Sequence, residues 1–142
     1  MPIRILLADD HVIVRQGIKY ILDEEGFQVV GEASNGQEAI HLAEKLGPDV
    51  AVLDVEMPIL NGIDATKEIV KASPMTKTVL LTMHSEYRFV LNGLRAGARG
   101  YLLKERASED LVKAVAEVNQ GGIYLSRPSL RQWCKLTSWQ AI

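Results

Sequence analysis

Polar side chains stand at the ends of four short apolar stretches of this 142-residue chain. Asp9 and Asp10 follow the first stretch, Asp54 closes another, Thr82 closes a third, and Lys104 follows a fourth. Clustered carboxylates repel one another, and a divalent cation that prefers oxygen ligands, Mg²⁺ or Mn²⁺, relieves that repulsion. An ammonium group opposite such a cation would clamp a phosphoryl group, with Asp54 as the candidate nucleophile.

These residues meet only if the stretches are neighbouring strands of one sheet. Apolar stretches of strand length alternate with amphipathic stretches of helical spacing, and the predicted strands are 3–8, 27–33, 49–54, 79–82 and 99–103. We expect the third helix to start at Asn61-Gly62 and the last to be capped by Ser108. Strict alternation predicts an α/β fold, a doubly wound five-stranded parallel sheet with helices on both faces. Ligands then bind at the carboxyl ends of the strands.

Composition narrows the class of protein. The length predicts one domain, and 47% hydrophobic with 24% charged residues is an ordinary globular composition. A net charge of −2 argues against a broad nucleic-acid surface, and a single cysteine, Cys134, excludes an internal disulfide framework. The apolar runs are too short to cross a bilayer, and no signal-peptide pattern opens the chain, so we expect a cytoplasmic protein without membrane contact.

Each polar residue has a plainer interpretation when taken alone. Asp9 or Asp10 could cap a helix, Asp54 could be a turn residue, Thr82 could be an ordinary strand residue, and Lys104 could be a solvated surface charge. The complementary groups at four strand ends favour a shared site. Glycine-rich dinucleotide and P-loop motifs are absent, and His11, His41 and His84 are too scattered for an obvious metal triad.

Four segments together resemble the receiver domain of two-component response regulators. The matching segments are Leu7-Ala8-Asp9-Asp10-His11, Leu53-Asp54-Val55-Glu56-Met57-Pro58, Leu81-Thr82-Met83-His84 and Gly100-Tyr101-Leu102-Leu103-Lys104. The resemblance covers residues 3 to 119. It implies the flavodoxin-like, CheY-like fold with strand order 2-1-3-4-5.

The resemblance also implies a role for each matching residue. Asp54 would accept the phosphoryl group in a Mg²⁺-dependent reaction. Asp10 would bind the metal directly, Asp9 mostly through water, and Glu56 through its backbone carbonyl. Thr82 and Lys104 would contact the phosphoryl oxygens, and Tyr101 would be an aromatic switch that turns inward on phosphorylation.

The individual residues of the last two segments resemble those of the subfamily that carries a LuxR-type helix-turn-helix effector. We expect a receiver over residues 1–122 and a linker or tail over 123–142, with the effector domain absent from this chain. The implied partners are a sensor histidine kinase, a second copy on phosphorylation, and DNA only through that effector. The alternative is a Mg²⁺-dependent phosphatase or phosphotransferase with an aspartyl intermediate. A degenerate receiver used for docking would predict loss of Asp54 or Lys104, and both are present.

Overall fold

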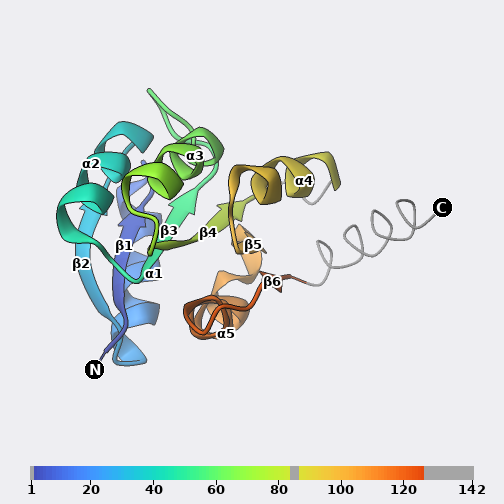
Figure 1. The fold of residues 1–142 in the computed structure, drawn as a ribbon. Coiled ribbons are helices and arrows are strands. Elements are labelled where there is room, and N and C mark those ends of the chain that lie inside the picture. Colours follow the sequence, from blue (N-terminus) through green and yellow to red (C-terminus); the bar gives the residue numbers. More distant parts are fainter. Residues whose placement is uncertain (1, 84–86, 127–142) are drawn as a thin grey trace.

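A parallel β-sheet forms the middle layer of the molecule (Figure 1). The computed structural model describes residues 2–83 and 87–126. The strands are β1 (Arg4–Ala8), β2 (Gln28–Ala33), β3 (Val50–Asp54), β4 (Lys77–Thr82), β5 (Gly100–Leu103) and β6 (Tyr124–Leu125). Their order is β2-β1-β3-β4-β5-β6, and every neighbouring pair is parallel. The predicted order of the first five strands is confirmed.

Helices cover both faces of this sheet. They are α1 (Val12–Glu24), α2 (Gly36–Leu46), α3 (Gly62–Ala72), α4 (Tyr87–Ala96) and α5 (Ala107–Asn119), with a 3₁₀ turn, η1, at Lys104–Arg106. Strand β3 is buried along its whole length because its side chains alternate between two cores. Ala51 and Leu53 face the core shared with α2, α3 and α4, whereas Val50 and Val52 face the core shared with α1 and α5. This explains the unbroken apolar pattern of the strand.

The sheet has a short sixth strand, β6, in addition to the five predicted strands. The amide N–H of Tyr124 donates to the Arg99 carbonyl at 2.9 Å, and that of Ser126 donates to the Tyr101 carbonyl at 3.1 Å. Two residues are too few to produce a periodic pattern, although residues 123–126 are predicted as a short extended piece. The segment expected as a linker therefore begins inside the sheet. Residues 127–142 lie outside the described residues.

The helix starts follow local hydrogen bonding, with one exception to the sequence prediction. Side-chain oxygens of Asn35 and Asn61 accept from the amides of Glu38 and Asp64, which fixes the starts of α2 and α3. Ser108 does not cap α5, because the helix continues directly out of η1 and already includes Ala107. Among residues 2–83 and 87–126, no helix has the length and apolar content needed to cross a membrane.

Candidate functional site

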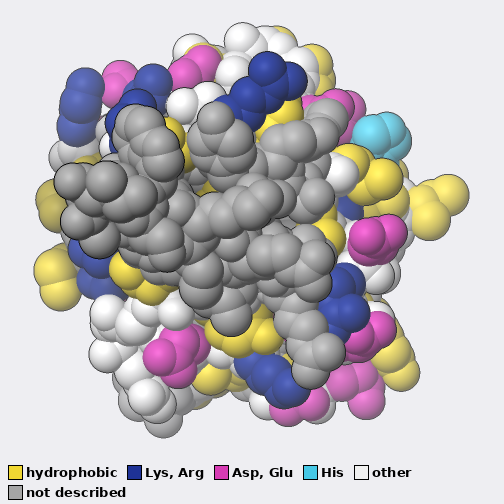
Figure 2. All heavy atoms as spheres, turned by 90° about the vertical axis from the view of Figure 1, so that its right-hand side faces the viewer, with side chains coloured by type: hydrophobic (Ala, Val, Ile, Leu, Met, Phe, Trp, Pro, Cys, Tyr) yellow, Lys and Arg dark blue, Asp and Glu magenta, His cyan; other side chains and the backbone are white. Residues whose placement is uncertain are grey.

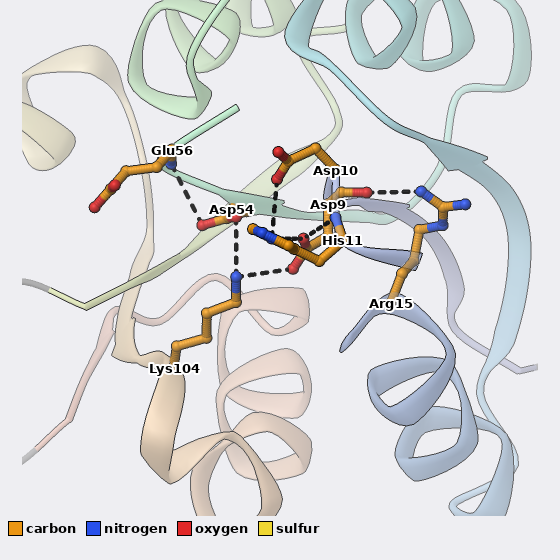
Figure 3. Close-up of polar contacts among 7 residues, drawn as sticks. All are labelled: Asp9, Asp10, His11, Arg15, Asp54, Glu56 and Lys104. Carbon is orange, nitrogen blue, oxygen red and sulfur yellow. Dashed lines mark hydrogen bonds and ion pairs between the residues drawn. The ribbon is translucent and has the colours of Figure 1, made fainter. Parts of the chain in front are cut away.

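The carboxyl ends of β1, β3 and β5 bring Asp9, Asp54 and Lys104 together (Figure 3). Asp54 is the last residue of β3, and Lys104 opens η1 directly after β5. The Lys104 ammonium donates to Asp54 Oδ2 at 3.0 Å and lies 3.1 Å from Asp9 Oδ2. One cation thus bridges two carboxylates from different strands, as the strand-end argument predicts.

Burial makes this charge cluster electrostatically strong. The side chains of Asp9, Asp54 and Lys104 are 1%, 5% and 15% exposed. Burial raises the pKa of Asp54, and the hydrogen bond and charge of Lys104 offset this rise only in part. Burial alone would lower the pKa of Lys104, but its contacts with Asp54 and Asp9 outweigh burial and raise it. The lysine therefore stays charged and holds the two acids in place.

The acidic side of the site has the donor set for a divalent cation. Asp9, Asp10, His11 and Asp54 each offer one ligand atom, and the four atoms lie within 4.8 Å of one another. Asp10 Oδ1 and Asp9 Oδ2 are buried without a hydrogen bond in the described part of the chain, and the Lys104 ion pair is the close polar contact of the latter. Unsatisfied buried carboxylate oxygens of this kind fit Mg²⁺, which prefers oxygen ligands. Glu56 lies beside them, and its amide donates to Asp54 Oδ1 at 3.3 Å.

Thr82 and Tyr101 lie on the two strands beyond Asp54. Thr82 is the buried last residue of β4, one position after Leu81, which pairs with Asp54. Tyr101 is fully buried in the core shared with α4, and a β-carbon at Gly93 would lie 3.1 Å from its Cδ2 atom. The ring thus has the inward position in this structure, where the lack of a side chain at Gly93 of α4 leaves room for it, and its turning on phosphorylation stays a prediction.

Two contacts that support the site were missed in the sequence. Arg15, in the second turn of α1, donates to the Asp9 carbonyl at 2.7 Å and to Glu32 Oε1 at 3.0 Å. It ties the acidic loop to β2 from the side opposite Lys104 (Figure 3). Gly62, the first residue of α3, packs against the end of β3. A β-carbon at this position would collide with the Asp54 carbonyl oxygen. In the sequence, the contact of Arg15 with the Asp9 carbonyl is indicated only by the short spacing between Arg15 and the acid pair.

Comparisons with known proteins agree with this geometry. Residues 5–116 match the family described as response regulator receiver domain. The chain is 41% identical over 124 residues to the transcriptional regulatory protein DegU of Brevibacillus brevis, covering 87% of this chain and 52% of that protein. It is 40% identical over 139 residues to the response regulator GacA of Pseudomonas aeruginosa, covering 97% of this chain and 64% of that protein.

A solved structure of a response regulator is closely similar to this one. It is a two-component response regulator of the LuxR family from Aurantimonas sp. SI85-9A1, with a TM-score of 0.91 and 32% identity, covering 97% of this chain and 99% of that one. The two curated relatives are longer proteins, and this chain spans 52% and 64% of their lengths.

Proposed function

This chain belongs to the receiver domain family of two-component response regulators, and on that basis we propose that Asp54 accepts a phosphoryl group from a sensor histidine kinase. The observation that carries the proposal is the Lys104 ammonium, which lies 3.0 Å from Asp54 Oδ2 and 3.1 Å from Asp9 Oδ2. A buried acceptor held by a cation beside two further acids suits charge-stabilised phosphoryl transfer.

The residues divide the work of transfer between them. An Asp54 carboxylate oxygen attacks phosphorus while the nitrogen–phosphorus bond of the kinase phosphohistidine breaks, and the imidazole leaves with the electron pair. The hydrogen bond and charge of Lys104 favour the ionised form of Asp54 and offset part of the rise in its pKa caused by burial. Lys104 would then pair with an oxygen of the attached phosphoryl group. Asp9, Asp10, Asp54 and the Glu56 carbonyl would hold Mg²⁺, which would supply positive charge to offset the negative charge of the transferred phosphoryl group.

The phosphorylated state would be transmitted through Thr82 and Tyr101. The Thr82 hydroxyl would move to a phosphoryl oxygen, and the Tyr101 ring would then be held in the inward position beneath α4, whereas without the phosphoryl group it would also turn outward. A phosphoryl group can only bias states by contacting them differently, so the unphosphorylated protein samples both. We assign the output to the surface of α4, β5 and α5, where a second copy would dock on phosphorylation.

The names of the relatives favour a role for this protein in the control of transcription over a role as a phosphatase or phosphotransferase. DegU carries the name of a transcriptional regulatory protein, and this chain spans about half its length. On the face shown in Figure 2, Lys and Arg side chains are interspersed with Asp and Glu. In this proposal, DNA contact is made by an effector domain and not by the receiver itself.

Labelling with acetyl phosphate in Mg²⁺ tests the acceptor. Intact-mass measurement should show one phosphoryl group on the wild type and none on Asp54→Asn, while Asp64→Asn, an acid in the first turn of α3, should behave as wild type. Labelling of the Asp54→Asn variant would refute the assignment. Continuous multiple turnover without a stable adduct would favour the phosphatase alternative instead.

Self-association tests the output surface. Sedimentation with and without beryllofluoride, a phosphoryl mimic, should show association in its presence. Unchanged association, together with amide shifts confined to α1, would place the output elsewhere.

A further inference from the structure

His11 belongs to the cluster of Asp9, Asp10 and Asp54, called the acidic pocket below, and its ring lies beside the acid pair (Figure 3). Its Nδ1 atom is 3.2 Å from Asp10 Oδ1 and 3.5 Å from Asp9 Oδ1. The ring is 67% exposed, so no packing contact of the core requires its presence. The backbone fixes its position, because the His11 amide donates to Asp9 Oδ1 at 2.9 Å.

These separations match ligands around one metal ion. An octahedral ion with bonds of about 2.1 Å places neighbouring ligand atoms about 3.0 Å apart and opposite ones about 4.2 Å apart. The two Nδ1–oxygen distances, 3.2 and 3.5 Å, are close to the first value. The four ligand atoms of the group lie within 4.8 Å of one another, which is about 0.6 Å more than the separation of opposite ligands. A small contraction of side chains would bring all four atoms around one ion.

The unsatisfied oxygen of Asp10 is the second observation that points to a metal. Asp10 Oδ1 is buried and has no hydrogen bond, although His11 Nδ1 is within reach at 3.2 Å. The two atoms approach without the alignment that a hydrogen bond needs. A buried carboxylate oxygen and an imidazole nitrogen that border the same space can both be satisfied by a cation.

We propose that His11 Nδ1 is a fourth protein ligand of this pocket and that it makes the pocket prefer divalent transition-metal ions over Mg²⁺. The inference rests on the proposed function, since the same carboxylates take the metal there. Imidazole binds Mg²⁺ poorly and gains affinity from Mn²⁺ to Co²⁺, following the order of first-row metals. The contribution of His11 to affinity should therefore increase from Mg²⁺ to Mn²⁺ to Co²⁺.

Electron paramagnetic resonance of Mn²⁺ can test both ligation and affinity. The free Mn²⁺ signal gives the Mn²⁺ affinity, displacement by Mg²⁺ or Co²⁺ gives theirs, and electron spin echo modulation detects a directly bound nitrogen. The variant is His11→Ala, which removes no capping hydrogen bond because the His11 side chain makes none. The matched control is His41→Ala, an exposed histidine on α2.

We expect nitrogen coupling in the wild type and in His41→Ala, and its loss in His11→Ala. Co²⁺ affinity should fall about tenfold or more in His11→Ala, Mn²⁺ affinity less, and Mg²⁺ affinity little. Absence of nitrogen coupling in the wild type, or equal losses for the three metals, would overturn the proposal. Failure of the phosphoacceptor assignment would appear separately, as labelling of Asp54→Asn by acetyl phosphate with nitrogen coupling unchanged.

Discussion

Replacing Lys104 by methionine would leave two buried carboxylates facing each other without their cation. The lysine nitrogen is 3.0 Å from Asp54 and 3.1 Å from Asp9, and both acids are at least nine-tenths buried. Removing one partner of a buried ion pair costs about 3–5 kcal/mol. Because Lys104 is 15% exposed, we expect a loss near the lower end of this range, about 3 kcal/mol of unfolding free energy at neutral pH.

The loss should depend on pH in a defined direction. The pKa of Asp54 is raised by burial, so the stability linked to its protonated form is present at low pH and is lost as pH rises through the folded-state pKa. Lys104 supplies the two largest influences that lower this pKa. Without them the pKa of Asp54 rises further, and the variant should lose stability over a wider range of rising pH than the wild type.

Mg²⁺ should restore most of the loss, because it replaces the missing positive charge. At a concentration 100 times its dissociation constant, a ligand of the folded state adds about 2.7 kcal/mol. Urea unfolding of the variant, in EDTA and in saturating Mg²⁺, measures this directly, with Lys113→Met on the exposed side of α5 as the control. An equal loss in both lysine variants, or a loss unaffected by pH and Mg²⁺, would refute the charge argument.

Three further substitutions test the support of the site. Asp54→Asn should raise the urea midpoint in EDTA near neutral pH, because burial disfavours the ionised carboxylate, and should shrink the gain from Mg²⁺; a lower midpoint in EDTA would contradict this. Arg15→Met should weaken Mg²⁺ binding about tenfold by calorimetry, whereas Lys19→Met, which contacts the same glutamate, should not. Gly62→Ala should cost about 1–3 kcal/mol in urea unfolding through its backbone collision, whereas Gly17→Ala, with open space in α1, should add about 0.5–1 kcal/mol; similar shifts for both glycines would contradict the packing argument.

The strand-end residues could be predicted because parallel topology leaves little freedom. Once β1, β3, β4 and β5 lie side by side and parallel in the observed order, Asp9, Asp54 and Lys104 must all lie at the carboxyl ends of the strands. The apolar run of β3 identified the central strand, and the resemblance supplied the order. The roles of Thr82 and of the Glu56 carbonyl remain predictions.

The contacts that were missed depend on details that periodicity does not encode. The contact of Arg15 with the Asp9 carbonyl depends on how α1 is oriented relative to the loop that precedes it. His11 was set aside for its distance from other histidines, whereas its partners are the adjacent acids. The Tyr101 ring of β5 is buried where Gly93 leaves room on α4, and such packing between separate elements is not visible in the sequence pattern.

The two-residue strand β6 decides where a stable receiver fragment can end. Without it, the outer edge of β5 would present unpaired backbone N–H and C=O groups, which can pair with the sheet of another molecule. Ser126 covers one more backbone group of β5, since its hydroxyl accepts a hydrogen bond from the Leu103 amide at 3.4 Å. A fragment cut at Gly122 would expose this edge and tend to aggregate by strand addition, whereas one cut after Ser126 would keep it covered.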